Sequence, residues 1–211
     1  MDYARDPTGW FDRLYAEAAG GDAVIPWQRG APHRHLAAWA EARALQGAGR
    51  RAVVVGCGLG DDAEYIAGFG FDTLAFDISP TAIGMARQLH PDSPVRYVTA
   101  DLLDPPPAWL GTFDLVVECI TVQALPDPPR AAAIANVGSL VAPGGTLLVI
   151  AFADDGTRPA RDKAGGRGGP PWPLSRAEID SFAVAGLVPA QVELVRDSGA
   201  HWVAEFSRPD D

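Results

Sequence analysis

The clearest structural signal in this chain is the segment Val53-Val54-Val55-Gly56-Cys57-Gly58-Leu59-Gly60. Three consecutive β-branched residues predict a strand that is buried on both faces, because a strand with one wet face would alternate. Glycines directly after such a strand let the backbone turn sharply and approach a ligand with no Cβ in the way. The segment therefore predicts a strand-to-helix turn that can form a ligand site.

The same order of strand and helix repeats on the C-terminal side of this turn. Alternation of this kind is typical of an α/β fold with a doubly wound, mostly parallel sheet. We expect seven strands, of which the last two form an antiparallel edge hairpin. The predicted strands are 51–55, 71–76, 95–99, 113–117, 146–152, 187–196 and 200–207, and the predicted helices between them are 61–68, 79–89, 128–141 and 175–186.

The length of 211 residues fits a single domain. We expect residues 1–48 to form an N-terminal helical cap segment, with helices at 7–19 and 34–47, on a core of residues 49–211. A loop at 153–173 is rich in glycine and proline, and loops of this length are usually functional or disordered.

Composition excludes several classes of function. Seventeen basic against 27 acidic residues give a formal charge of −10, which disfavours binding to nucleic acid. No apolar run is long enough to span a membrane, and the first residues do not resemble a secretion signal. Two cysteines, Cys57 and Cys119, without metal-type spacing, favour a reducing cytoplasm, and we predict no metal site.

Two carboxylates at the ends of later strands suggest which ligand the glycine turn receives. Asp77 follows Gly60 by seventeen residues and can accept hydrogen bonds from both hydroxyls of a ribose. Asp101 can accept from an exocyclic amine, and Leu102 can pack on an adenine. A dinucleotide fingerprint needs a glycine where this chain has Asp61, so a cationic sulfonium ligand fits better than a pyrophosphate.

These residues resemble the class I S-adenosylmethionine-dependent methyltransferases, from about Ala52 to Phe152, which have a Rossmann-like fold. The resemblance implies that S-adenosyl-L-methionine is the cofactor. Its methionine part would lie against the glycine turn, its ribose against Asp77 and its adenine against Asp101 and Leu102. The cofactor-binding set implied in this way is Trp27, Gly56, Cys57, Gly58, Gly60, Asp77, Ile78, Asp101, Leu102 and Glu118.

Three features are similar to the thiopurine and halide/thiol methyltransferase branch of that superfamily. Most of the superfamily has an acid two residues before the first glycine, where this chain has Val54, and this branch tends to lack it. The segment Ile25-Pro26-Trp27-Gln28-Arg29-Gly30-Ala31-Pro32 resembles an N-terminal segment that folds over the cofactor. The segment Gly169-Pro170-Pro171-Trp172-Pro173 resembles a Gly-Pro-Pro-aromatic element after the fifth strand.

Residues near the same edge of the predicted sheet are candidates for binding the methyl acceptor. Glu118 ends the fourth strand and is a candidate catalytic residue, with a role as a hydrogen-bonded structural acid equally compatible. His33 is a second candidate catalytic residue as a proton acceptor, although a solvent-facing histidine at a helix start is the commoner case. The candidate substrate-binding residues are Trp27, Arg29, Thr121, Gln123 and Trp172, with Trp172 expected as a lid aromatic.

The predicted function is methylation of a heteroatom, with sulfur favoured, on a small molecule. Methylation of oxygen or nitrogen on a small natural product is the first alternative. A regulator that binds the cofactor without turnover is an alternative of another class, and a dinucleotide oxidoreductase is disfavoured by Asp61. The protein is expected to be a monomer or homodimer, and nothing in the sequence names the acceptor.

Overall fold

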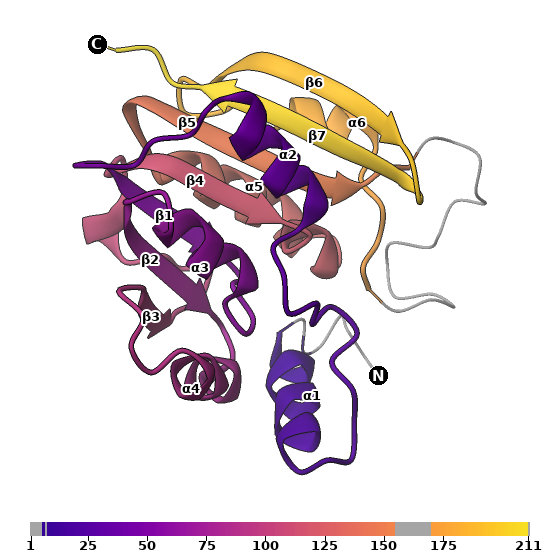
Figure 1. Ribbon diagram of the computed structural model, residues 1–211. Coiled ribbons are helices and arrows are strands. Elements are labelled where there is room, and N and C mark those ends of the chain that lie inside the picture. The colour runs from indigo at the N-terminus through magenta and orange to yellow at the C-terminus, as the bar shows by residue number, and fades with distance from the viewer. Residues whose placement is uncertain (1–5, 7, 155–169, 211) are drawn as a thin grey trace.

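The computed structural model describes residue 6, residues 8–154 and residues 170–210. Its centre is one seven-stranded sheet with the strand order β3-β2-β1-β4-β5-β7-β6 (Figure 1). β7 runs antiparallel to both β5 and β6, and the other pairs are parallel. The predicted fold class is confirmed. The strands are β1 (Arg51–Val55), β2 (Asp72–Asp77), β3 (Arg96–Thr99), β4 (Phe113–Cys119), β5 (Val141–Phe152), β6 (Val188–Arg196) and β7 (Ala200–Ser207).

Helices cover both faces of this sheet, and the first one lies beside its edge. In Figure 1, α2 and α3 lie on one face, α5 and α6 lie on the other, and α1 stands near α4, away from the strands. The helices are α1 (Gly9–Ala19), α2 (Arg34–Ala42), α3 (Asp61–Ala67), α4 (Pro80–Leu89), α5 (Pro129–Ser139) and α6 (Arg176–Asp180), with short 3-10 turns η1 (Pro107–Trp109) and η2 (Val122–Ala124).

Alternate residues of β1 pack into two separate cores, which explains why its sequence is apolar throughout. Val53 and Val55 join the cluster that contains α5 and α6, whereas Ala52 and Val54 join the cluster that contains α2 and α3. All four side chains are at most 2% exposed. A strand buried on both faces has no position for a polar residue, as the continuous run predicted.

Two helix starts follow from local sequence signals. Ser79 accepts a hydrogen bond from the N–H of Ala82, and Pro80 occupies the first helical position. Ser175 and Glu178 form a complete capping box. The helix that follows Ser175 is shorter than predicted: α6 ends at Asp180, and Ala185 and Gly186 have φ values of 53° and 84°, which no α-helix accommodates.

Other boundaries also differ from the prediction. α2 ends at Ala42 instead of residue 47, because Ala44 has a φ of 45°. β5 starts at Val141 and includes Gly144, whereas the predicted strand begins at residue 146. Residues 155–169 of the predicted loop and Pro7 of the first predicted helix lie outside the described residues. Among the helices that the structure describes, none is long and apolar enough to cross a membrane.

Candidate active site

A cavity of about 550 Å³ opens where β1, β2 and β4 end. Ligand sites of doubly wound sheets lie at the carboxyl ends of the strands, and the strand order here reverses between β1 and β4. The walls come from the turns after these strands, from α1 and from the segment that precedes α2. Of the residues predicted from the sequence, those that line the cavity are Trp27, Arg29, His33, Gly56, Cys57, Gly58, Asp77, Ile78, Asp101, Leu102 and Thr121.

The glycine turn brings bare backbone to the floor of the cavity. Gly56 and Gly58 have φ values of 60° and 53°, in the left-handed region that favours glycine. A Cβ on Gly58 would lie 2.9 Å from the hydroxyl of Tyr15, and one on Gly56 would overlap Thr121. The turn therefore needs glycine at both positions, for conformation and for space.

Asp77 connects the glycine turn to the start of α4. The N–H of Gly58 donates to Oδ2 of Asp77 over 3.0 Å, and the N–H of Ser79 donates to Oδ1 over 2.9 Å. Burial raises the pKa of Asp77, and the two backbone donors act in the opposite direction. Each carboxylate oxygen keeps lone-pair capacity for a further donor, as binding of a diol requires.

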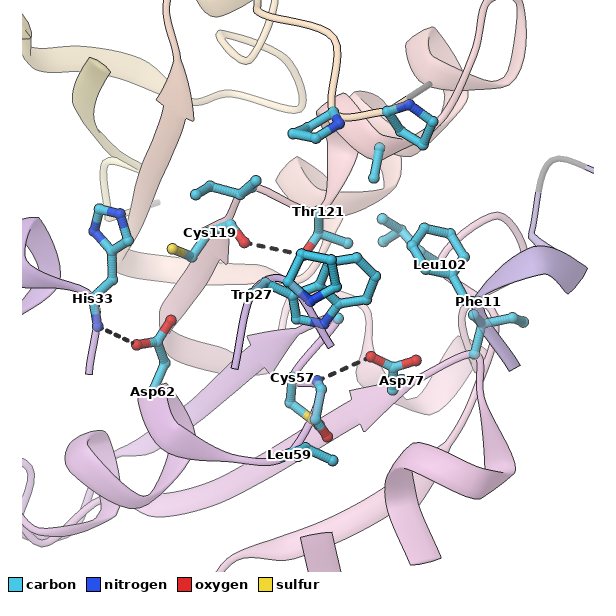
Figure 2. A pocket seen from close by; sticks show the side chains of 18 of the residues that line it. Phe11, Trp27, His33, Cys57, Leu59, Asp62, Asp77, Leu102, Cys119 and Thr121 are labelled. Atoms are coloured by element: carbon cyan, nitrogen blue, oxygen red, sulfur yellow. Dashed lines mark hydrogen bonds between the residues drawn. The ribbon is translucent and has the colours of Figure 1, made fainter. Parts of the chain in front are cut away.

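The end of β3 contributes a second carboxylate and an apolar wall. Asp101 accepts a hydrogen bond from the N–H of Leu103 over 2.8 Å, which fixes its side chain in the turn. Leu102 is buried and lines the cavity. Figure 2 shows Leu102 and Phe11 on the same side of the cavity as Asp77. The structure thus brings Asp77, Asp101 and Leu102 to one end of the cavity.

Trp27 lies across the middle of the cavity (Figure 2). Its indole N–H donates to the hydroxyl of Tyr15 over 2.7 Å, and a Cβ on Gly58 would lie 3.7 Å from that indole nitrogen. Burial raises the pKa of Tyr15, so the phenol stays protonated. The segment that contains Trp27 is therefore folded over the glycine turn.

Two carboxylates at the start of α3 hold this segment in place. Asp61 accepts from the N–H groups of Gly30 (2.9 Å) and Arg29 (3.3 Å), and Asp62 accepts from the N–H of His33 over 2.6 Å. The Arg29 guanidinium lies 3.4 Å from Asp62. We predicted that these acids would favour a cationic ligand. In the structure, Asp61 and Asp62 instead bind the segment that precedes α2.

His33 is the N-cap of α2 and is 5% exposed. Burial, with help from the Arg29 guanidinium, lowers the pKa of His33 to about 3, so its ring is neutral near pH 7. Its Nδ1 accepts from the N–H of His35 over 3.3 Å. The ring therefore has its hydrogen on Nε2 and offers no free lone pair for taking a proton.

Glu118 and Gln123 do not line the cavity, contrary to the prediction. Glu118 is 1% exposed, and its Oε1 accepts from the N–H groups of Thr121 and Val122 at 2.8 and 2.9 Å. Burial raises the pKa of Glu118 to about 7. Gln123 is fully buried and accepts from the N–H of Phe152 over 2.7 Å. Both side chains shape the turn after β4 from beneath.

Trp172 and Gly60 also lie elsewhere than predicted. Trp172 is fully buried, with the Arg130 guanidinium 5.8 Å from its ring centroid, so it belongs to the core and not to a lid. Pro170 and Pro171, just before it, line the cavity instead. Gly60 faces Tyr97, with which a Cβ at this position would overlap.

Several cavity residues were not predicted from the sequence. Tyr15, Phe152 and His201 line the cavity, but no motif surrounds them. Tyr15 could have been found as part of the apolar face of α1. His201 could not, because the pairing of β7 with β5 places it opposite Phe152 across 49 residues of sequence.

Three side chains near the cavity mouth have the chemistry of metal ligands. Ligand atoms of His35, His201 and Asp197 lie within 4.8 Å of one another. However, the Arg34 guanidinium donates to both oxygens of Asp197, at 2.6 and 2.9 Å, and lies 3.5 Å from Nδ1 of His201. Arg34 already provides this cluster with its positive charge.

Comparison with known proteins agrees with this geometry. The family model of a methyltransferase domain matches residues 52–145, which include the glycine turn, Asp77 and Asp101. Residues 52–145 are therefore similar to a methyltransferase domain. The branch to which this domain belongs is not decided by its relatives, because they include methyltransferases of different acceptors.

Curated relatives of this methyltransferase domain fall into two groups by coverage. The ubiquinone biosynthesis O-methyltransferase of Methylococcus capsulatus is 37% identical over 48% of this chain, and the chain spans 43% of its length. The 2-heptyl-1-hydroxyquinolin-4(1H)-one methyltransferase of Mycobacteroides abscessus is 24% identical over 86% of this chain and 80% of its own. Probable thiol methyltransferase 2 of Arabidopsis thaliana is 26% identical, with 82% and 76% covered.

Solved structures share the fold over nearly the whole chain. One such structure comes from work on the conversion of a disulfide bond into a thioacetal group during echinomycin biosynthesis. It has a TM-score of 0.75 and 24% identity, and the match covers 96% of this chain and 91% of that one. The N-methyltransferase NodS of Bradyrhizobium japonicum, in complex with S-adenosyl-L-homocysteine, has a TM-score of 0.70 and 21% identity, covering 94% and 100%.

Proposed function

We propose that this chain transfers a methyl group from S-adenosylmethionine to a heteroatom, with sulfur favoured, of a small and largely apolar molecule. The observation that carries the proposal is the cavity itself, where the glycine turn and Asp77 meet an apolar wall. The backbone of Gly56 and Gly58 lines the cavity and would hold the methionine part of the cofactor. Asp77 would hold the ribose, and Asp101 and Leu102 the adenine.

The cofactor supplies a methyl group on a positively charged sulfur, and the protein orients the two reactants and excludes water from them. In an in-line displacement the acceptor atom forms a bond to the methyl carbon as the carbon–sulfur bond of the sulfonium breaks. No nucleophilic side chain is required, so the residues described above act by orienting both partners and excluding water. Trp27, folded over the turn, and Cys119 and Ile120, which line the cavity, contribute to that exclusion.

The state of the candidate bases favours an acceptor that ionises without help. His33 has its Nδ1 occupied, and Glu118 faces the turn after β4. A thiol needs no base, because an appreciable fraction is thiolate near neutral pH. An aliphatic alcohol would need one. The similarity to probable thiol methyltransferase 2 of Arabidopsis thaliana also supports sulfur as the acceptor atom.

The experiment is a screen for methylated products. The protein is incubated with S-adenosylmethionine that carries an isotopically labelled methyl group and with matched sets of arylthiols, alkylthiols, phenols and arylamines. Mass spectrometry is expected to detect labelled thioethers first and with the highest kcat/KM. Labelled ethers or methylamines without thioethers would overturn the choice of sulfur. Cofactor binding without any product would favour a regulator.

An acidic hydroxyl on a heterocycle is the second candidate acceptor. The hydroxyquinolone methyltransferase of Mycobacteroides abscessus covers this chain as fully as the thiol enzyme, and the acceptor in its name carries an N-hydroxyl group. Such a hydroxyl also ionises without a strong base, so the same cavity suits it. N-hydroxyquinolones therefore belong in the screen beside the thiols.

A further inference from the structure

Three histidines from two elements meet at one end of the cavity. His33 and His35 begin α2, and His201 lies at the start of β7. The ring centroids are 5.3 Å apart for His33 and His35, 5.8 Å for His33 and His201, and 4.9 Å for His35 and His201. Only His33 and His201 line the cavity. Figure 2 shows His33 on the side opposite Asp77, beside Cys119.

The hydrogen bonds of these two rings fix which nitrogen carries the hydrogen. Nδ1 of His33 receives the backbone N–H of His35. Nδ1 of His201 lies 3.5 Å from Nη2 of Arg34, and a guanidinium has donors only. Both Nδ1 atoms are therefore acceptors, so a neutral ring at either position has its hydrogen on Nε2.

Both rings are held in the neutral form by their surroundings. Burial lowers the pKa of both His33 and His201, and nearby cations add to the effect: Arg29 for His33 and Arg34 for His201. Asp197 and the backbone of Gly199 oppose the shift at His201. Each ring is thus a hydrogen-bond donor through Nε2 and not a positive charge.

Neither Nε2 has a hydrogen-bond partner among the described residues. His35 differs, because its Nε2 is enclosed and unpartnered, whereas those of His33 and His201 are not among the enclosed polar atoms. Phe152 packs against His201 with 4.8 Å between centroids. Two N–H donors are therefore available at this end of the cavity, which Phe152, Arg29, Arg34 and Asp62 also line. A few polar groups in fixed positions are the pattern by which a pocket orients a ligand.

We infer that Nε2–H of His33 and Nε2–H of His201 together bind the anionic atom of the methyl acceptor, so that the cavity selects acceptors that enter as thiolates or oxyanions. This inference rests on the proposed function, since it names how the acceptor is held. Two neutral donors can bind an anion strongly without first losing a proton to it, unlike two imidazolium rings. It also explains how the site works without a base in contact with the acceptor.

The test measures binding without turnover. The complete chain is saturated with S-adenosylhomocysteine and titrated calorimetrically at pH 8 with 4-nitrothiophenol, which is ionised, and with its methyl thioether, which cannot ionise. The variants are His33→Leu and His201→Leu, which remove the donor, and His33→Gln and His201→Gln, which keep an N–H near the position of Nε2. His90→Leu, at a half-buried histidine away from the cavity, is the matched control.

We expect the wild-type protein to bind the thiolate more tightly than the thioether. Each leucine variant should weaken thiolate binding by about tenfold or more, because a hydrogen bond to a charged group is lost. Each glutamine variant should recover most of that loss, and thioether binding should change less than twofold throughout. His90→Leu should match the wild type for both ligands.

Several results would overturn the inference. Equal losses for thiolate and thioether would show that the rings only pack, and glutamine variants no better than leucine variants would remove the donor role. A wild-type protein without preference for the thiolate, or one that binds neither ligand, would overturn it as well. Detection of methylated product is a separate measurement: product with unchanged thiolate binding in the variants defeats this inference alone, and thiolate preference without any product defeats the proposed function alone.

Discussion

Glu118 is a buried carboxyl that does not line the cavity but makes the stability of the protein depend on pH. Its pKa in the folded protein is about 7, above the ordinary value of 4.5, so the folded state holds the proton more tightly than the unfolded state. Stability from this group is complete at low pH and is lost as the pH rises from about 4.5 to about 7. Above that range the buried charge costs about 3 kcal/mol.

Glu118→Gln should therefore raise stability at high pH only. A glutamine oxygen can still accept from the N–H groups of Thr121 and Val122, but it carries no charge. We expect the midpoint of urea unfolding to rise at pH 8 relative to the wild-type protein and to be nearly unchanged at pH 5. A variant that is less stable than the wild type at pH 8 would show that the ionised carboxylate is needed there.

A substitution at Trp172 distinguishes a role in the core from a role in a lid. It is fully buried, so truncation leaves a large cavity in the core. Trp172→Ala should reduce the free energy of unfolding by about 3–5 kcal/mol. Denaturant unfolding measures the loss, and Trp109→Ala, at a partly exposed tryptophan, should cost less. A variant that binds the acceptor less tightly but is as stable as the wild type would support the lid role of Trp172 instead.

At the scale of elements, the segment before α2 depends on the first turn of α3. Asp62 binds the N–H of His33, and Asp61 binds those of Arg29 and Gly30. Acidic residues at a helix N-terminus are favoured by the helix dipole, so these side chains are stable in that position and can serve as anchors. They connect Trp27 and His33, which line the cavity, to the rigid core.

Asp62→Ala should release this segment. We expect faster amide hydrogen exchange in residues 25–33, by about tenfold or more, because the buried hydrogen bond at His33 is lost. Mass spectrometry of peptic fragments measures the exchange, and Asp72→Ala, at an exposed aspartate at the start of β2, is the control. Unchanged protection of the segment would mean that Trp27 and its neighbours are held by packing alone.

The elements could be predicted where local rules act alone. The run at 51–55, the helix starts at Ser79 and Ser175 and the glycine turn each have a signal within a few residues, and they appear as predicted. The end of α6 at Asp180 could not, because Phe182 and Leu187 beyond it are buried in the core cluster, and no local motif marks where the helix stops.

At the scale of the whole molecule, the order of the strands was predictable, but the direction in which individual side chains point was not. Alternating strands and helices leave few topologies, so the sheet and the position of its ligand crevice follow from the sequence. Glu118 precedes a tight turn in which Ile120 has a φ of 61°, and that turn directs the carboxyl beneath the chain. His201 reaches the cavity only through the pairing of β7 with β5.

Cofactor binding should also stabilise the whole fold. A ligand that binds only the native state at 100 times its dissociation constant adds about 2.7 kcal/mol. For a chain of this size, S-adenosylhomocysteine should then raise the melting temperature by about 5 °C or more. Differential scanning fluorimetry measures the shift, with adenosine monophosphate as a comparison ligand. Equal shifts for both ligands would indicate a general nucleotide site.

The central claim is that the glycine turn and Asp77 bind the cofactor, the turn through its methionine part and Asp77 through its ribose. Calorimetric titration of S-adenosylhomocysteine into the wild-type protein and into Asp77→Ala tests it most directly. We predict one equivalent bound by the wild type and an affinity weaker by about tenfold or more in the variant, because hydrogen bonds from the ribose to a carboxylate are lost. No binding to the wild type, or equal affinity for both proteins, would contradict the account.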